Sequence, residues 1–329
     1  MKPFEYQKVA SPDEAFASRK AKSVLLAGGT NVLDLMKKHI QQPDQLVDVN
    51  DALSNEIEEN KEGLRIGAAV KNTAIAEHDV VKSAYPLLSK AILKGASPQI
   101  RNMASAAGNI MQRTRCPYFF DLTQPCNKRE NGSGCSALGG NHRMGAIIGY
   151  SDACVAVHPS DFCVALAALD ARVDYLVPNN QAGEEQEIAF TDFHRLPGEN
   201  PEQDNILPQN AIITGIRIPA NNFQKHSAYL KLRDRDSYAF ALISVAAALE
   251  MKKGKIREAR LASGGVAHKA WRWREAEKYL KNKPATTEHF EKAAELVIQQ
   301  VKALPDNQFK VPMLKAAIQE ALKQCANTK

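Results

Sequence analysis

Residues 23–39, SVLLAGGTNVLDLMKKH, decide the expected fold because they join a strand, a glycine turn and a helix. The first four residues are typical of a short buried strand, and the apolar spacing after the turn predicts a helix from about Val32 to His39. In the turn AGGTN, glycines let a backbone approach a phosphate closely, and N–H groups at a helix start can bind an anion. On this pentapeptide alone, a tight turn with Thr30 or Asn31 as N-cap is the better explanation.

Two further segments carry small or polar residues in positions that suit a ligand. Residues 99–110, QIRNMASAAGNI, directly precede a long loop, and their small side chains suit a backbone packed against a flat ligand. A close crossing of a helix and a strand is the competing explanation. His158–Asp161, HPSD, lies at the predicted start of a helix over residues 161–171. Asp161 could bond a ribose or a ring, although such a residue is more often part of a helix cap.

Four cysteines mark the long loop that begins after Ile110. They are spaced C-x9-C-x8-C-x18-C among many prolines, asparagines and glycines: Cys116, Cys126, Cys135 and Cys154. A loop this long inside a compact domain is rare unless something holds it together. Four thiolates can ligate an iron–sulfur cluster or a zinc ion, and disulfides are the competing explanation.

The composition is that of an ordinary soluble globular protein. The 329 residues are 44% hydrophobic and 24% charged, which is enough to bury a core without disulfides. The N-terminus lacks the apolar segment of a secretory signal, and the longest apolar run, residues 239–249, is too short to span a bilayer. We therefore expect a cytoplasmic protein with reduced thiols, which favours a metal over disulfides. The net charge of +6 is scattered and does not indicate nucleic-acid binding.

The rest of the chain shows two patterns, separated by a composition break at residues 219–225. Before the break, the expected strands are 46–49, 64–70, 172–177 and 211–218, and the spacing is helical between 73 and 95. After it, the expected strands are 227–233, 241–251 and 256–265, followed by helices near 271–281, 287–303 and 311–325. The C-terminal part therefore predicts an antiparallel sheet covered by helices.

Together these segments resemble the FAD-binding subunit of the molybdenum hydroxylase family, to which xanthine dehydrogenase and carbon monoxide dehydrogenase belong. AGGTN is similar to the first pyrophosphate loop of the family. Residues 99–110 are similar to the second, with Ser105 and Ala107 departing from its usual Thr and Gly. Further family motifs are matched by residues 207–219, 229–239 and 264–272. The resemblance covers nearly the whole chain.

The cysteine loop is found in two kinds of family member, the benzoyl-coenzyme A reductase type and the bacterial periplasmic aldehyde oxidoreductase type. Residues 112–119, 124–129 and 132–135 look especially like the second type, and all four cysteines match its pattern. In that type the loop holds a [4Fe–4S] cluster. The resemblance therefore implies that Cys116, Cys126, Cys135 and Cys154 are cluster ligands, flanked by the positive charges of Arg113, Arg115, Lys128 and Arg129.

The resemblance implies an α+β fold with an FAD-binding domain of the vanillyl-alcohol oxidase or molybdopterin dehydrogenase type. This domain would cover residues 1–222, with subdomains of about 1–55 and 56–222 and the cysteine loop at 112–157. A C-terminal α+β domain of the carbon monoxide dehydrogenase flavoprotein type would cover 223–329. The expected FAD-binding residues are Leu26, Ala27, Gly28, Gly29, Thr30, Asn31, Val32, Ser105, Gly108, Asn109, Arg115, Asp161, Ile213 and Lys231. Backbone N–H groups of both loops are expected to hold the FAD.

The implied function is electron transfer within a molybdenum-containing aldehyde oxidoreductase. A large molybdopterin-binding subunit would oxidise the substrate, and a small [2Fe–2S] subunit would pass electrons to the FAD of this chain. The FAD would then reduce an external acceptor that the sequence does not identify. We expect no catalytic side chain here, because the cofactors carry the chemistry. A partner with an export signal could carry the folded complex to the periplasm.

Two alternatives from other classes remain open at the level of sequence. One is a self-contained flavin oxidase of the vanillyl-alcohol type, which would need a larger C-terminal cap than about a hundred residues provide. The other is a binding module stabilised by zinc. The remaining cysteines, Cys163 and Cys325, are expected to be inert thiols in helices. His142 and His158 are possible metal ligands for which we prefer a structural or surface role.

Overall fold

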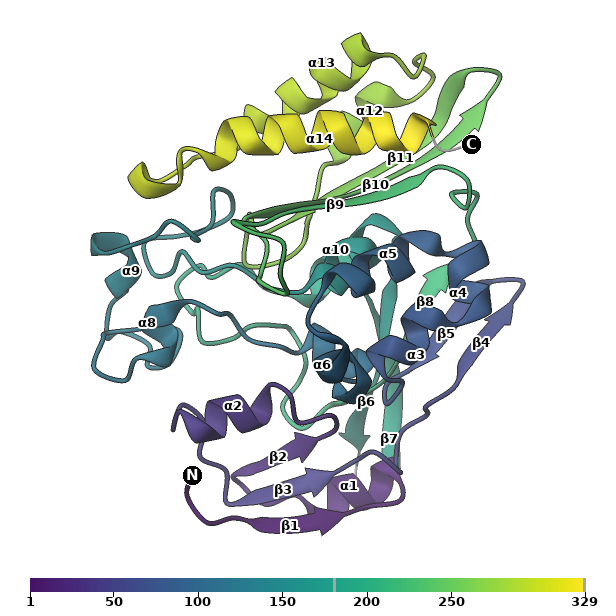
Figure 1. The fold of residues 1–329 in the computed structure, drawn as a ribbon. Helices are drawn as coiled ribbons and strands as arrows, with labels where there is room; N and C mark the ends of the chain where they lie inside the picture. Colours follow the sequence, from purple (N-terminus) through teal and green to yellow (C-terminus); the bar gives the residue numbers. More distant parts are fainter. Residues whose placement is uncertain (180–181, 328–329) are drawn as a thin grey trace.

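The computed structural model describes residues 1–179 and 182–327, and their strands form three separate sheets. Figure 1 shows the smallest sheet at one end of the molecule, a five-stranded sheet in the middle and the C-terminal sheet with its helices at the other end. The strands are β1 Glu5–Lys8, β2 Ser23–Leu26, β3 Gln45–Asp48, β4 Ile57–Asn60, β5 Gly63–Gly67, β6 Arg172–Asn179, β7 Ala182–Ala189, β8 Ile212–Pro219, β9 Ser227–Leu232, β10 Ile243–Lys252, β11 Lys255–Gly264 and β12 Trp271–Arg272.

The helices cover these sheets and fill the space between them. They are α1 Pro12–Ser18, α2 Val32–Lys37, α3 Asn72–Glu77, α4 Asp79–Ala84, α5 Pro86–Lys94, α6 Pro98–Met103, α7 Ala106–Ile110, α8 Pro117–Phe120, α9 Ser136–Gly139, α10 Asp161–Ala168, α11 Phe190–Phe193, α12 Arg274–Leu280, α13 Thr287–Ile298, the 3-10 turn η1 Pro305–Asn307, and α14 Lys310–Asn327. Among the described residues, no helix combines the length and the apolar character needed to cross a bilayer.

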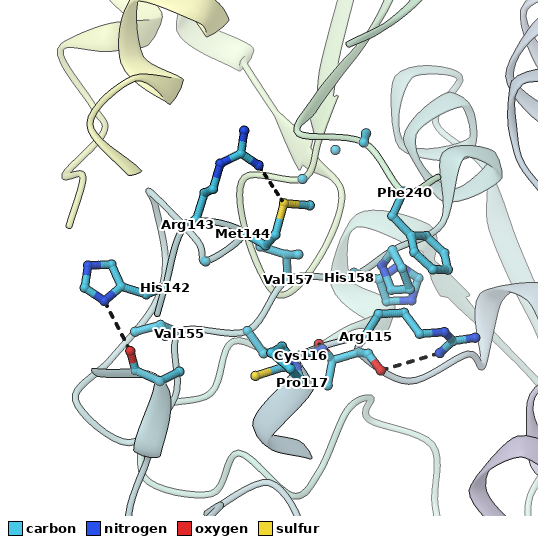
Figure 2. Close-up of a pocket in the computed structure, with 18 of the residues that line it drawn as sticks. Arg115, Cys116, Pro117, His142, Arg143, Met144, Val155, Val157, His158 and Phe240 are labelled. Atoms are coloured by element: carbon cyan, nitrogen blue, oxygen red, sulfur yellow. Dashed lines mark hydrogen bonds between the residues drawn. The ribbon is translucent and has the colours of Figure 1, made fainter. Parts of the chain in front are cut away.

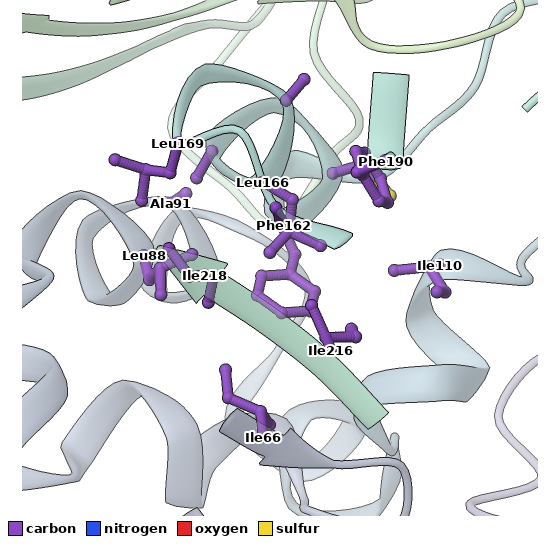
Figure 3. Close-up of a cluster of buried hydrophobic side chains, with 14 of the residues drawn as sticks. Ile66, Leu88, Ala91, Ile110, Phe162, Leu166, Leu169, Phe190, Ile216 and Ile218 are labelled. Atoms are coloured by element: carbon purple, nitrogen blue, oxygen red, sulfur yellow. The ribbon is translucent and has the colours of Figure 1, made fainter. Parts of the chain in front are cut away.

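The N-terminal sheet is parallel and has the order β1–β3–β2, so β3 is its central strand. The middle sheet is antiparallel and has the order β4–β5–β8–β6–β7. Its core is formed with α5 and α10, and Figure 3 shows Phe162 and Leu166 of α10 above Ile66 and Ile216 of the sheet. These contacts join segments that are far apart in the sequence into one hydrophobic core.

The C-terminal sheet is antiparallel, has the order β12–β11–β10–β9, and is buried on both faces. Alternate residues of β10 point to opposite faces, because side chains alternate along a strand. Ala246 and Ala248 belong to the core shared with α10, whereas Val245 and Ala247 belong to the core under the C-terminal helices. Helix α10 has no polar face, and all eight of its residues are buried between the two domains.

The cysteine loop lies beside both domains and contains only the short helices α8 and α9 (Figure 1). Phe119 of α8 and Cys126 pack against Leu35 of α2, the helix that follows the glycine turn. From the other side, Lys310 Nζ donates to the carbonyls of Met144, Gly145 and Gly265 at 3.2, 2.9 and 2.9 Å. The loop is therefore fixed by side chains from outside it rather than by its own secondary structure.

The predicted α+β architecture and the C-terminal antiparallel sheet with helices are confirmed. The helical spacing of residues 73–95 does not form one helix, because the chain is extended at His78 and Pro86 starts a new helix after Tyr85. The helix predicted over 161–171 ends at Ala168, and the one predicted over 271–281 begins only at Arg274, since Trp271–Arg272 pairs as β12.

Candidate functional site

The glycine turn presents a row of backbone donors without partners. The carbonyls of Leu26, Ala27, Gly29 and Asn31 accept bonds from Val49 N, Asn50 Nδ2, Leu33 N and Leu35 N. The N–H groups of residues 28–32 donate to nothing in the part of the chain that the structure describes. Asn31 occupies the N-cap position of α2, but its side chain makes no capping bond. The turn is thus better suited to an anion than to capping its own helix.

Gly28 and Gly29 are required by the close packing and the backbone of this turn. A Cβ on Gly28 would lie 2.0 Å from the carbonyl oxygen of Met103, so the turn could no longer rest on the end of α6. Gly29 has φ +72°, a conformation that glycine adopts without strain. Together they bring the turn next to the second predicted loop.

Four of the five amides of residues 105–109 already have acceptors in the protein, contrary to the expectation from sequence. The amides of Ala106 and Ala107 donate to Val70 O and Ala68 O at 2.8 and 3.1 Å. Those of Gly108 and Asn109 donate to Ser105, to its side-chain oxygen and its carbonyl respectively. Residues 105–109 can therefore form a small, flat wall for a ligand, but they cannot hold it through these amides.

Both loops line one cleft of about 450 Å³. Of the predicted FAD-binding residues, those on its lining are Ala27, Gly28, Gly29, Thr30, Asn31, Val32, Ser105, Gly108 and Ile213. Leu26 and Asn109 do not line it. Two polar atoms on the residues of this cleft, Asn31 Oδ1 and Arg19 Nε, are buried without a partner. Such atoms are costly in a finished protein interior and indicate that a polar ligand completes the cleft.

The structure places Asp161 and Lys231 together but away from this cleft. Lys231 Nζ bonds Asp161 Oδ2 at 2.8 Å and Lys94 O at 2.9 Å, and both side chains are buried. Tyr229 donates to Asp161 Oδ1 at 2.7 Å. Burial, with the Asp161 charge beside it, raises the pKa of Tyr229 well above its ordinary value. Asp161 lines two further cavities, whereas Lys231 lines neither and acts by holding Asp161.

The larger of these cavities measures about 320 Å³ and lies between the cysteine loop and the C-terminal domain. Figure 2 shows the rings of His158 and Phe240 and the guanidinium of Arg115 gathered on one side of it, with Cys116 nearby. The Arg115 guanidinium lies 5.4 Å from the ring centroid of Phe240 and donates to Arg113 O at 2.6 Å. Arg115 therefore lines this cavity together with Cys116, a predicted cluster ligand, and does not line the glycine cleft.

A small cavity of about 50 Å³ adjoins the 320 Å³ cavity, with which it shares Ser160 and Asp161. Asn109 on its lining is next in sequence to Gly108 of the glycine cleft, although the two cavities share no lining residue. Unpartnered buried atoms occur here too, on Asn72 Oδ1 and Arg101 Nε.

The four predicted cluster ligands all line one small cavity of about 10 Å³. Cys126 and Cys135 pair as an isolated β-bridge, and Cys135 lies within bonding reach of Cys154. Their interaction lowers the pKa of Cys135 to about 6 and raises that of Cys154, because the two thiols share a proton. All six cysteines of the chain are free thiols in this structure. Of the four, Cys135 is therefore the most readily deprotonated, and no disulfide holds the loop.

The four sulfurs do not yet form a compact metal site. Among the described residues, the group of three potential ligand atoms that all lie within 4.8 Å of one another is His158, Cys163 and His194. Cys135 and Cys154 are within bonding reach of each other, close to the separation of about 3.8 Å between two sulfurs on one zinc ion. The four thiols can therefore ligate either a zinc ion or an iron–sulfur cluster.

The His158, Cys163 and His194 group is a poor metal site despite its short distances. Burial raises the pKa of Cys163 to about 12, so this thiol stays protonated, as expected for an inert residue. The Nε2 atom of His194 already donates to Ile110 O at 2.8 Å. His142 is buried and structural, since it donates to carbonyls of its own loop and accepts from Asp306 N. Cys325 is buried in α14 and donates to His226 O.

Comparison with known proteins gives the family. A family model described as the FAD binding domain in molybdopterin dehydrogenase matches residues 2–221. A second, described as the CO dehydrogenase flavoprotein C-terminal domain, matches residues 227–325. The chain belongs to the molybdopterin dehydrogenase flavoprotein family. The predicted family is therefore confirmed.

Relatives and solved structures of this flavoprotein family match over most of the chain. The aldehyde oxidoreductase FAD-binding subunit PaoB of Escherichia coli (strain K12) is 47% identical over 85% of this chain and 86% of its own length. The glyceraldehyde dehydrogenase medium chain of Sulfolobus acidocaldarius is 25% identical over 98% of both chains. The fold matches reconstituted CO dehydrogenase from Oligotropha carboxidovorans with a TM-score of 0.76 and 20% identity, covering 100% of this chain and 99% of that one.

The residues present fit FAD. The glycine turn supplies unpaired donors for a diphosphate, the second loop supplies a flat wall, and unpartnered polar atoms occur on residues lining the cavities of about 450, 320 and 50 Å³. Several of these groups were missed from the sequence: Arg19, Tyr229, Phe240 and Asp204, which also lines the glycine cleft. Of these, only Tyr229 lies in one of the family motif regions, residues 229–239, and the others gave no local pattern.

Asn31 tests the glycine cleft without disturbing the fold. Asn31→Ala removes a buried oxygen that has no protein partner, so the unfolding temperature should not fall. FAD affinity should fall by about tenfold, the size expected for one hydrogen bond. Asn222→Ala, which changes an asparagine bonded to Glu250 on the C-terminal sheet, is the control. Unchanged FAD affinity in Asn31→Ala, measured by fluorescence titration, would contradict the placement.

The pH dependence of stability tests whether His268 and His194 are buried in the neutral form. Burial lowers the pKa of His268 to about 3 and that of His194 to about 4. The unfolded chain takes up protons near pH 6.5 while the native chain does not, so stability should decline as the pH falls from about 6.5 to about 4. Since neither nitrogen of His268 has a partner, His268→Leu should make this decline shallower. Denaturant unfolding at several pH values measures it. The exposed His39, replaced by Asn, is the control, and an unaltered slope in His268→Leu contradicts the prediction.

Proposed function

We propose that this chain is the FAD-carrying electron-transfer subunit of a molybdenum-containing aldehyde oxidoreductase, with a [4Fe–4S] cluster on its four loop cysteines. The substrate class is supported by the 47% identity to the FAD-binding subunit of an aldehyde oxidoreductase. The observation that carries the cluster is that four free thiols line one cavity, in the loop whose sequence resembles the cluster-binding loop of the aldehyde oxidoreductase type. The same loop packs on α2, directly behind the predicted FAD turn.

The protein residues bind and orient the flavin in this proposal. FAD, when bound, supplies hydride and one-electron chemistry. The amides of residues 28–32 and the Asn31 side chain would hold its diphosphate, and Ser105, Ala107 and Gly108 would form the wall behind it. The Lys231–Tyr229 pair fixes the Asp161 carboxylate at the far cavities.

The cluster would be held by Cys116, Cys126, Cys135 and Cys154. The present cavity of about 10 Å³ is too small for four irons, so the irregular loop has to widen on loading. Lys128 lines this cavity with a nearly buried ammonium and would offset the negative charge of the cluster. Arg129 instead braces the loop by donating to the carbonyls of Tyr118 and Phe119.

A large molybdopterin-binding subunit and a small [2Fe–2S] subunit are the proposed partners. Several relatives are named as medium chains or FAD-binding subunits of larger enzymes. Apolar side chains are exposed near the far cavities: Leu93 and Ile100 on α5 and α6, and Tyr238 and Phe240 in the following domain. An electron donor bound there would cover them. The external acceptor stays unassigned, and the compartment would follow from the export signal of a partner.

The function is tested by adding an aldehyde to the anaerobic complex purified with its partner subunits. Electrons from aldehyde oxidation should bleach the flavin absorption and part of the broad iron–sulfur absorption of this chain. The control is the complex from which FAD has been removed, which should lose transfer to an external dye but keep reduction of the [2Fe–2S] subunit. A flavin that stays oxidised while aldehyde is consumed contradicts the proposal, and so does a lone chain that oxidises aldehydes by itself.

A further inference from the structure

Three charged side chains form a line between the cysteine cavity and the glycine cleft. Lys128 Nζ contacts Asp204 Oδ1 at 2.5 Å, and Arg113 Nε donates to Asp204 Oδ2 at 2.6 Å. Each carboxylate oxygen of Asp204 thus pairs with one cation. The side chains of Lys128, Asp204 and Arg113 are 5%, 22% and 24% exposed, so water screens these contacts weakly. We call these residues the charge bridge.

The two ends of the charge bridge face different sites. Lys128 lines the four-cysteine cavity, and its charge acts on Cys154. Arg113 and Asp204 line the glycine cleft together with the predicted FAD turn. No other ion pair among the described residues has one partner on the lining of the cysteine cavity and the other on the lining of the glycine cleft.

The backbone around the charge bridge keeps its members in place. Lys128 Nζ also donates to Pro201 O at 2.9 Å, and Arg113 donates to the carbonyls of Lys128 and Glu202 at 3.1 and 3.2 Å. The Arg113 guanidinium lies 4.8 Å from the ring centroid of Phe119, next to the loop cysteines. A displacement of Lys128 is therefore transmitted to Arg113 through both the carboxylate and the loop backbone.

The charges explain why the two sites would influence one another. Burial tends to raise the pKa of Asp204, but Lys128 and Arg113 outweigh it and keep this carboxylate ionised. The bridge then carries one net positive charge. Thiolates at the cysteine cavity would attract the Lys128 ammonium and fix its position. Without them, only Asp204 and the carbonyl of Pro201 hold Lys128, so Asp204 and Arg113 are held less firmly at the cleft.

We propose that Asp204 is a positioning residue through which the four-cysteine site and the FAD cleft stabilise each other. This inference rests on the proposed function for the identity of the two ligands. Neither Asp204 nor Arg113 needs to react. Loading of the cysteine site fixes Lys128, Lys128 fixes Asp204, and Asp204 holds Arg113 on the wall of the FAD cleft. The cluster would then stabilise the bound flavin even where it lies off the direct electron path.

A double-mutant cycle on the complex tests this coupling. FAD dissociation constants are measured after removal and re-addition of FAD, for wild type, Cys154→Ser, Asp204→Asn and the double variant. Each single change should weaken FAD binding by about 5- to 20-fold, and the double variant should be no weaker than the weaker single one. Asp174→Asn is the matched control, because Asp174 is similarly buried and paired with Arg217 on the middle sheet. It should leave FAD affinity unchanged.

The redox potential separates this role from simple loss of structure. Lys128→Met should lower the midpoint potential of the cluster and weaken FAD, whereas Lys128→Arg should restore both, because it keeps the charge. Unchanged FAD affinity in Cys154→Ser, or effects that multiply in the double variant, overturn the coupling while the function stands. Zinc in place of iron in the wild-type protein would contradict the cluster. The double-mutant cycle on FAD affinity would still test the coupling between the two sites, because Lys128 faces the same thiolates. Wild type without FAD contradicts both.

Discussion

The structure depends on how the backbone hydrogen-bonding groups of the cysteine loop find partners. Residues 112–157 form almost no secondary structure of their own, apart from α8 and α9. Buried carbonyls need donors, and several of the donors here come from outside the loop. Lys310 donates to Met144 and Gly145, and Asn307 donates to the carbonyls of His142, Gly145 and Ala146. These donors belong to the C-terminal domain. The loop thus joins the FAD-binding part to the C-terminal part, and its four thiols are set at a junction that neither part forms alone.

That junction places the two expected cofactor sites back to back. Helix α2 begins at the turn with the free amides, and its inner face holds Phe119 and Cys126 of the loop. The helix that begins at the predicted anion site therefore also supports the thiol site through Leu35. A relay subunit has reason for such an arrangement, because electron transfer needs cofactors that are close and rigidly held. In the proposed function, the chain supplies position and charge, and other subunits carry out the substrate chemistry.

The sequence predicted the elements whose signals lie within a few residues. It did not predict the contacts between residues that are far apart in the chain. The glycine turn, the helix at Asp161 and the C-terminal strands lie where the pattern indicated, because glycine, capping and alternation act within a few residues. The free amides of residues 28–32 agree with the anion interpretation, but the amides of residues 106–109 donate to protein acceptors that no pattern showed. The pairing of Asp204 with Arg113 joins residues 91 positions apart. The pairing of Asp161 with Lys231 joins residues 70 positions apart.

The most direct test of the account is the cofactor content of the purified wild-type chain, taken from its complex. One FAD with about four irons and four sulfides per chain, and a spectrum with flavin bands over a broad brown shoulder, is the predicted result. Serine at Cys116, Cys126, Cys135 or Cys154 should lower the iron, whereas Cys163→Ser and Cys325→Ser should keep it, because those thiols are buried in helices away from the loop. About one zinc and no iron in the wild type would contradict the central claim and leave a flavoprotein with a structural metal.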